Sequence, residues 1–218
     1  MASVAAATLL CSHQASAQSA GQWMLQGGFT TISPHVDSGD LSAPAFPGTQ
    51  ADVHSATSLT GAVTYMVRDN MSVSVPLALP FKHKIVGDGA IAGVGKLGEV
   101  KSLPMTVFAQ YRFLTPDAVF RPYVGLGLTY AKFFKARSTA ALTGLTGGSP
   151  SDPTTLKVDS KFAATAQIGA TYALSPRWFI DAQATYTPLK TTTQLSTGQT
   201  LDIELDPTSV ALAVGYKF

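Results

Sequence analysis

Hydrophobic and polar residues alternate one by one along most of this chain, which is the period of a β-strand. The last segment has the clearest alternation: Val210, Leu212, Val214, Tyr216 and Phe218 fall on one face, and small or weakly polar residues fall on the other. Eight segments carry this pattern. Their predicted bounds are 22–32, 57–67, 71–81, 103–113, 121–134, 162–174, 178–189 and 208–218.

The connections between these segments alternate in length. Three are short and rich in turn residues: 68–70, 114–119 and 175–177. Four are long: 33–55, 82–102, 136–159 and 190–206. This asymmetry is typical of outer-membrane barrels, whose short turns are periplasmic. We therefore predict an all-β fold, an eight-stranded antiparallel transmembrane β-barrel with long extracellular loops and both termini in the periplasm.

The composition decides which strand face points outwards. Charged residues make up 13% of the chain, about half of the roughly 25% found in soluble domains. The smaller face carries Gly, Ala, Ser, Thr and Gln, which suits a narrow lumen better than a soluble surface. The large apolar face is therefore predicted to meet lipid. Aromatic residues recur near strand ends on the short-turn side, where an interfacial girdle belongs; they are Tyr65, Phe113, Tyr172, Trp178, Tyr216 and Phe218.

Residues 1–17 have the features of a secretory signal peptide. An apolar stretch at 4–11 precedes the sequence Ala15-Ser16-Ala17, an A-x-A cleavage signal. No Lys or Arg precedes the apolar stretch, which a start codon assigned too far downstream would explain; the alternative is an Ala/Ser-rich tail. The mature barrel is predicted to comprise residues 18–218. Cys11, the only cysteine, would leave with the signal, so no thiol chemistry is expected.

The sequence offers little that could support catalysis or cofactor binding. The net charge is +2 and no cluster of Lys or Arg forms a phosphate-binding stripe, so nucleic acid is not an expected partner. His35, His54 and His83 all lie in predicted loops with no metal-ligand spacing, and we expect them to be solvent-exposed. No nucleophile and orienting acid accompany them. We predict neither an enzyme nor a bound metal or cofactor.

Four charged residues fall on the inward phase near the short-turn end: Arg112, Arg121, Asp181 and Lys217. In a narrow lumen of low dielectric constant such groups should pair. One interpretation is a periplasmic plug that blocks straight passage. The other is an ion-pair network with a purely structural role, and the sequence does not separate the two.

Prolines at 76, 80 and 104 fall on two neighbouring predicted strands. Proline has no backbone N–H and so removes donors from the strand ladder. Pro76, Pro80 and Pro104 therefore predict a locally opened seam and a candidate lateral gate. The alternative is ordinary strand-end proline, which suits Pro80 and Pro104 better than Pro76.

Several stretches of the chain resemble the outer membrane protein W family. They include PFKHKI at 80–85, FRPYVGLGLTY at 120–130 and the ending GYKF at 215–218. The resemblance covers nearly all of the mature chain except the long loops. It implies an eight-stranded barrel with a narrow, rather hydrophobic channel that passes small apolar molecules and releases them sideways through its wall.

The inward phase also holds apolar residues that could line such a path or simply fill the interior. They are Met24, Met66, Phe108, Tyr123 and Phe133. The resemblance implies a constriction by large apolar residues in the middle of the third and seventh strands. Here the matching inward positions are Pro76 and Thr185, so the site of any constriction differs.

Two functions follow from these observations. The first is an outer-membrane channel for small hydrophobic molecules, with lateral release into the membrane. The second is a structural or recognition barrel with an occluded interior, acting through its extracellular loops. The expected partners are outer-membrane lipid, small apolar solutes and the barrel-assembly machinery, whose recognition signal the terminal Phe218 resembles.

Overall fold

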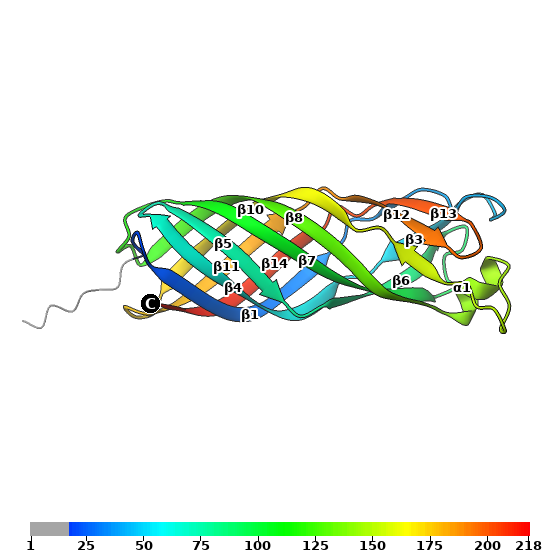
Figure 1. Cartoon of the computed structure of the whole chain (residues 1–218), viewed down its shortest axis with the longest axis horizontal. Helices are drawn as coiled ribbons and strands as arrows, with labels where there is room; N and C mark the ends of the chain where they lie inside the picture. Colours follow the sequence, from blue (N-terminus) through cyan, green and yellow to red (C-terminus); the bar gives the residue numbers. More distant parts are fainter. Residues whose placement is uncertain (1–17) are drawn as a thin grey trace, which may run out of the picture.

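The computed structural model describes residues 18–218 and forms an elongated, closed β-barrel (Figure 1). The strands of the barrel wall are tilted around its long axis. Their bounds are β1 (Trp23–Ser33), β4 (Ala56–Arg68), β5 (Met71–Ala78), β7 (Lys96–Arg112), β8 (Phe120–Ser138), β10 (Lys161–Ala173), β11 (Trp178–Tyr186) and β14 (Thr208–Lys217). The predicted signal peptide and Cys11 lie outside the described residues.

Antiparallel pairing closes the barrel on itself. Each wall strand pairs with the next, and β1 returns to β14 with Met24 opposite Lys217 and Phe29 opposite Leu212. The C-terminus and the start of β1 therefore lie at one end, which is also the end of the short turns (Figure 1). The predicted eight-stranded antiparallel fold is confirmed.

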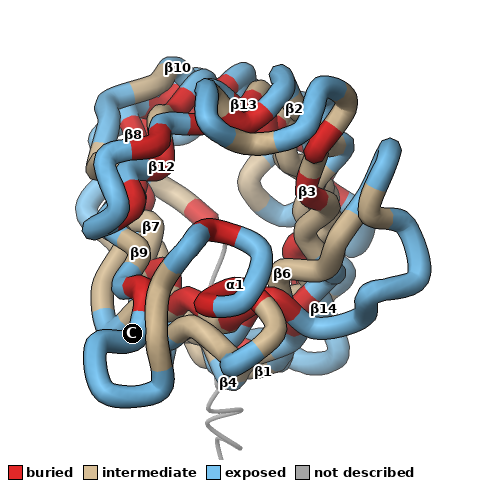
Figure 2. The backbone as a smooth tube through the Cα atoms, turned by 90° about the vertical axis from the view of Figure 1, so that its right-hand side faces the viewer, coloured by how far each residue is buried: buried red, intermediate tan, exposed pale blue. Residues whose placement is uncertain are grey.

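The other end of the barrel is built from further strands rather than irregular loops. The wall continues in β3 (Thr49–Val53) and β6 (Phe81–Gly89), which pair with each other, and β6 also pairs with β7. A second sheet joins β2 (Asp37–Ser38), β13 (Thr200–Glu204), β12 (Lys190–Leu195) and β9 (Leu156–Val158) in that order. Figure 2 looks onto this end along the barrel axis, where α1 (Ala140–Leu145) lies within one part of the ring. No helix in residues 18–218 is long and apolar enough to cross a membrane.

The prediction of a loop at 82–102 is wrong, because β6 and the first part of β7 form a hairpin there. The third predicted strand, 71–81, is also interrupted between Ala78 and Phe81. The hairpin has a physical reason. Beyond the lipid the outward face is wet, so Lys82 and Lys84 point out while His83 is buried, the reverse of the lipid-facing pattern.

The two faces of the wall differ as the composition predicts. Outward side chains such as Phe29, Leu126 and Leu212 are more than half exposed to the surroundings of the chain. The inward face is held by hydroxyl groups. The Thr129 hydroxyl lies 2.8 Å from the Thr106 hydroxyl on one neighbouring strand and 2.6 Å from the Thr165 hydroxyl on the other. Such cross-strand pairs stabilise a sheet locally.

Aromatic rings surround the short-turn end in contact with one another. Trp178 packs edge-on against Tyr216, and Tyr216 against Phe218, with centroids 5.1 and 5.0 Å apart. The ring centroids of Trp23 and Tyr65 lie 4.7 Å apart. Rings of this kind occupy the membrane–water interface.

Candidate functional site

The barrel encloses a cavity of about 210 Å³ in the half nearer the loops. Its upper wall is apolar and includes Leu142 of α1 and Leu201 and Ile203 of β13, which belong to a buried cluster that caps the barrel. Its lower wall includes Phe108 of β7 and Thr185 of β11. The cavity therefore runs from the loop sheet down to the middle of the barrel.

A layer of hydrogen-bonded polar side chains, here called the polar floor, lies across the lumen below the cavity. Its members come from β7, β8, β10 and β11; they are Gln110, Arg112, Tyr123, Gln167, Asp181 and Gln183. The Gln110 Nε2 donates to Gln167 Oε1 at 2.8 Å. The Tyr123 hydroxyl lies 3.0 and 3.1 Å from the Asp181 carboxylate oxygens. Gln26 of β1 also donates to Asp181, at 3.3 Å, so the floor spans the barrel.

The floor depends on inward glycines that leave room for its large side chains. A Cβ on Gly169 would lie 2.5 Å from the Tyr123 hydroxyl, and one on Gly125 would lie 2.6 Å from Gln167 Oε1. No real side chains tolerate contacts of this length without moving. The glycines on the inward face thus fix where the bulky groups fit.

Arg112 and Asp181 sit in the floor without direct contact. The Arg112 guanidinium donates to Gln18 Oε1, Ser72 Oγ and Gln110 Oε1 at 3.1–3.2 Å and stacks 4.6 Å from the centre of the Tyr123 ring. Tyr123 thus lies between the cation and the anion. Within residues 18–218 the only ion pairs are Lys96–Glu99 and Lys190–Glu204, so the predicted pairing among the four inward charges is wrong.

Arg121 and Lys217 lie nearer the periplasmic rim and are also buried. Arg121 donates to three backbone carbonyls, those of Gln18, Asp69 and Phe113. Arg112 and Arg121 thus donate to neutral amide, hydroxyl and carbonyl oxygens, where ion pairs with carboxylates were expected. The four charges do lie toward the short-turn end, and all four are buried there.

Met24 and Met66 do not line the cavity. With Phe179 they form a fully buried cluster on the periplasmic side of the floor. Their place is interior filling, one of the two readings that the sequence left open. Of the other predicted lumen residues, Phe108, Phe133 and Thr185 line the cavity, whereas Tyr123 belongs to the floor.

The barrel wall has a gap in strand pairing, here called the seam, beside the cavity. Pairing of β5 with β7 ends at Ser74 and Phe108 and resumes between Phe81 of β6 and Ser102 of β7. The opposite edges stay paired, since β5 pairs with β4 up to Ala78 and β7 pairs with β8 throughout this stretch.

The prolines account for the seam through the direction of the missing donors. In an antiparallel ladder the N–H and C=O of one residue point to the same neighbour and alternate along the strand. Leu79 donates to Leu59 of β4 and Arg112 donates to Asn70, so even-numbered residues of β5 and β7 face each other. Pro76 and Pro104 therefore lack the very N–H groups that would bridge the seam. Pro80 falls in the interruption between β5 and β6.

The cavity reaches the seam. Its lining includes Pro76, Ala78 and Pro104, and it also includes Leu77, whose side chain belongs to the lipid-facing surface and is 55% exposed. At the seam the cavity is therefore separated from the lipid-facing surface by a single layer of residues, Leu77 among them.

The comparisons agree with this architecture. The OmpW family model matches residues 19–218. The chain belongs to the OmpW family. The outer membrane protein W of Vibrio cholerae serotype O1 is 36% identical over 204 residues, covering 91% of this chain and 89% of that protein.

Two solved structures extend the likeness to three dimensions. The crystal structure of the outer membrane protein OprG from Pseudomonas aeruginosa superposes with a TM-score of 0.83 at 29% identity, covering 93% of this chain and 98% of that one. The solid-state NMR structure of the outer membrane protein AlkL in DMPC bilayers gives a TM-score of 0.68 at 25% identity, covering 92% and 91%. This OmpW-family chain is thus a non-enzymatic barrel embedded in the lipid of the bacterial outer membrane.

The histidines of this OmpW-family barrel occupy different environments. His35 and His54 are exposed, but His83 is buried in β6, and its predicted exposure is wrong. The His83 Nδ1 lies 3.0 Å from the His54 carbonyl oxygen and its Nε2 lies 3.1 Å from Ser102 Oγ. Among the described residues no group of three or more His, Cys, Asp or Glu could hold a metal ion.

Two features of the OmpW-family site were missed in the sequence. The first is Gln18, which is buried at the periplasmic end and touches Arg112, Arg121 and Thr171. The second is Phe179, whose ring fills the space above Gly215. Alternation identifies Phe179 as inward once β11 is registered, whereas nothing before the first strand signals that Gln18 folds back into the lumen.

Proposed function

We propose that this OmpW-family barrel passes small hydrophobic molecules from the extracellular side into its cavity and releases them sideways through the seam. The observation that carries the proposal is the joint lining of the cavity by capping residues, by Pro76 and Pro104 and by the lipid-facing Leu77. The polar floor supports a sideways exit, because it occupies the axial route to the periplasm.

The cavity's size and lining support an apolar cargo. Engineered cavities of about 150 Å³ with apolar walls bind benzene-sized molecules, and the volume here is about 210 Å³. Leu, Ile and Phe side chains dominate its upper part. An apolar solute would gain the usual transfer free energy on leaving water, whereas crossing the floor would bring it against buried charges and amides without new partners for them.

The gate residues in this proposal are Pro76, Pro80 and Pro104. Because Pro76 and Pro104 cannot donate across the seam, opening it breaks fewer backbone hydrogen bonds than opening any paired stretch of the wall. The lipid-facing side chains Leu77 and Met105 would then be the first groups that a departing solute meets.

Uptake into vesicles tests the proposal. The purified barrel is placed in phosphatidylcholine vesicles that contain an enzyme or dye responsive to a medium-chain apolar alcohol or alkane. We expect entry of the apolar solute to be faster than in barrel-free vesicles and entry of a sugar of similar size to be unchanged. Equal apolar uptake with and without the barrel would contradict the proposal.

A recognition barrel that acts through its loops is the second candidate, because the extracellular end is an ordered sheet with its own buried cluster. It predicts no solute flux and loss of surface binding when residues 136–159 are removed. The same vesicles separate the two candidates, because the first predicts uptake of the apolar solute and the second predicts none.

A further inference from the structure

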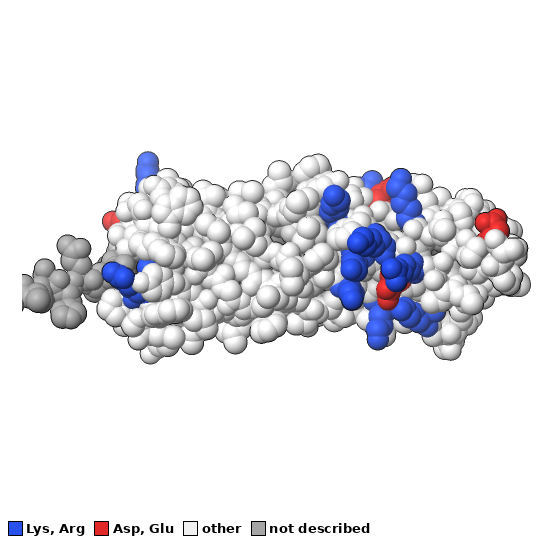
Figure 3. Space-filling view, turned by 60° about the horizontal axis from the view of Figure 1, so that its bottom comes forward, with Lys and Arg blue, Asp and Glu red and all other residues white. Residues whose placement is uncertain are grey.

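One face of the barrel carries a concentrated group of basic side chains. Figure 3 shows Lys and Arg gathered toward the loop end with an acidic side chain among them, while the long apolar part of this face is free of charge. We define the basic band by its residues on β6, β7 and β8; they are Lys82, Lys84, Lys96, Lys101, Lys132 and Arg137.

The register brings these cations together. Lys82 lies directly opposite Lys101 in the β6–β7 ladder, and both point outwards because their neighbours His83 and Ser102 are buried. Lys132 of β8 pairs with Leu103, which places it diagonally beside Lys101. Like charges directly opposite each other on a strand pair are destabilising unless something compensates them.

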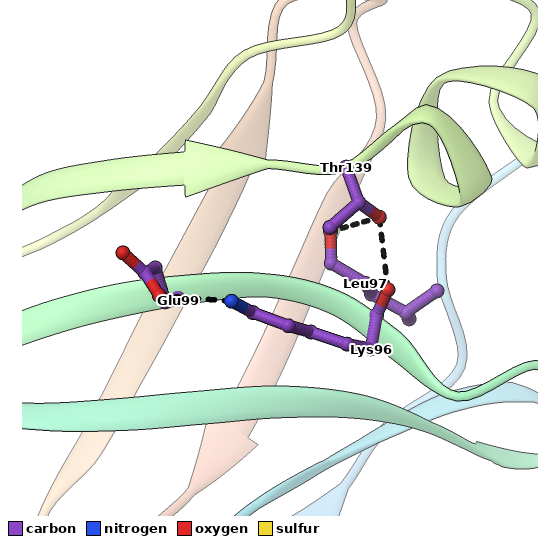
Figure 4. Close-up of polar contacts among 4 residues, drawn as sticks. All are labelled: Lys96, Leu97, Glu99 and Thr139. Carbon is purple, nitrogen blue, oxygen red and sulfur yellow. Dashed lines mark hydrogen bonds and ion pairs between the residues drawn. The ribbon is translucent and has the colours of Figure 1, made fainter.

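Glu99 lies directly opposite Lys84 in the β6–β7 ladder, and its carboxylate is already engaged by Lys96. Glu99 Oε2 accepts from Lys96 Nζ at 2.8 Å, as Figure 4 shows, and Thr139 fixes the backbone of Lys96 and Leu97 through its hydroxyl at 2.9 and 3.0 Å. The hydrogen bond from Lys96, its charge, and the charges of Arg137 and Lys82 lower the pKa of Glu99. Among the described residues Lys82, Lys84, Lys101 and Lys132 have no carboxylate within ion-pair distance.

The band also has a defined height relative to the membrane. The outward residues just below it are Leu79 and Met105, which are 58% and 46% exposed and belong to the lipid-facing belt. Its cations therefore stand where the apolar belt ends, at the level of lipid headgroups on the extracellular side. Lys and Arg at such a level attract anionic headgroups.

We propose that the basic band is a binding site for the phosphate groups of a phosphorylated lipid in the outer leaflet. Its phosphates lie between Lys82, Lys101 and Lys132, and its acyl chains lie against Leu79 and Met105 beside the seam. A soluble anion would satisfy the charges but not the apolar surface directly beneath them, and this favours a lipid as the occupant. The site is independent of whether any solute crosses the barrel.

Binding of a defined lipid to the full-length barrel in neutral detergent tests the site. The probes are bisphosphorylated lipid A, the same lipid without its phosphates, and inorganic phosphate as a competitor. We expect Lys82→Gln to weaken binding of the bisphosphorylated lipid about fivefold, which corresponds to about 1 kcal/mol per basic residue near a lipid surface. The double variant Lys82→Gln/Lys101→Gln should weaken it by more than tenfold.

Lys157→Gln is the matched control, because Lys157 is an exposed strand lysine of β9 outside the band. It should bind the lipid as the natural chain does. Equal affinity for the lipid with and without phosphates, equal loss in Lys157→Gln, or displacement of the lipid by millimolar inorganic phosphate would each overturn the proposal.

A stability measurement separates lipid binding from a structural role, and the single variant Lys101→Gln suffices if the double variant folds poorly. In neutral phosphatidylcholine this variant should resist urea at least as well as the natural chain, because a repulsive pair is removed. In vesicles containing the bisphosphorylated lipid it should unfold at lower urea than the natural chain. The same direction of change in both lipids would contradict the site.

Discussion

Space at single inward positions decides how the periplasmic half of the barrel packs. Gly169 gives room to Tyr123, and Gly215 to Phe179. The polar contacts are as local: Tyr123 reaches Asp181 because the inward residue on its neighbouring strand has no side chain. Tyr123 in the floor and Phe179 in the cluster below it are thus each matched to a glycine on an adjacent strand.

Gly215→Ala should destabilise the barrel by about 1–3 kcal/mol, the usual cost of overpacking a filled interior. The added Cβ would lie 2.1 Å from the Phe179 ring, which is fully buried and has no free space to enter. Urea unfolding in vesicles measures the effect. Gly27→Ala is the control, because nothing lies within 4 Å of a Cβ added at position 27. This substitution should leave the stability unchanged or raise it slightly. Equal losses in both variants would contradict the packing argument.

His83 should make the stability of the barrel depend on pH. Burial lowers the pKa of His83, against the opposing effect of its hydrogen bond to the His54 carbonyl. The unfolded chain, with an ordinary pKa of about 6.5, then binds more protons below that pH than the folded chain. The contribution of a neutral His83 is complete above about pH 6.5 and declines as the pH falls toward the folded pKa.

The measurement compares the natural chain with His83→Gln in urea at pH 7.5 and pH 5. The natural chain should lose more stability on acidification than the variant, which keeps a polar side chain without the titration. Parallel losses in the two proteins would show that other groups carry the pH dependence.

At the level of elements, the lipid-facing strands could be predicted from the sequence and the extracellular ones could not. Alternation with apolar residues outside locates β1, β4, β10 and β14 to within about one residue at each end. The pattern reverses above the membrane, where Ile203 is buried and charged residues such as Lys84 and Asp202 point out, so alternation with apolar residues outside does not predict β6 and β13. The gap in β5–β7 pairing could be anticipated because proline removes a donor whatever the environment.

Contacts inside the lumen were the least predictable feature of the elements. Which inward groups meet depends on the register and shear of all the strands, and a single sequence fixes neither. The inward charges were identified, but the partners of Arg112 and Asp181 turned out to be Gln18, Gln110, Tyr123 and Gln26.

Replacing Pro76 and Pro104 together by Ala should tighten the seam. Two N–H groups would then point across it and could extend the β5–β7 ladder, each new bond contributing about 0.5–1.5 kcal/mol. Hydrogen exchange at 75–79 and 103–107 should slow. Pro122→Ala, in the paired part of β8, is the control and should leave that exchange unchanged. Faster exchange at the seam in the double variant would contradict the assignment of these donors.

For the whole molecule, closure joins the first and last strands and leaves a terminal aromatic residue exposed at the interface. Phe218 is 67% exposed, and its N–H donates to the Trp23 carbonyl at 2.9 Å. It packs edge-on against Tyr216 but adds little to the interior. Its removal should therefore matter less for the finished barrel than for its assembly.

Deletion of Phe218 should reduce the amount of heat-modifiable, folded barrel in the outer membrane of expressing cells. The same deletion should leave refolding into detergent or vesicles nearly unchanged, because the interior packing is intact. Normal assembly in cells would remove the case for Phe218 as a signal to the assembly machinery. Equal loss in cells and in vitro would assign it a structural role instead.

Lateral release of the solute through the barrel wall is tested most directly by locking the seam. Continuing the β5–β7 register past Ser74 and Phe108 places Leu77 opposite Met105. Leu77→Cys/Met105→Cys can be bridged by oxidation or by a short bifunctional thiol reagent and released by reductant. Val73→Cys/Ala109→Cys is the control, since these residues already pair directly.

Uptake of an apolar solute into vesicles is then measured with each pair bridged and released. Bridging 77 to 105 should slow uptake to the barrel-free rate, reduction should restore it, and bridging 73 to 109 should have no effect. Undiminished uptake through a barrel whose seam is bridged would contradict lateral release.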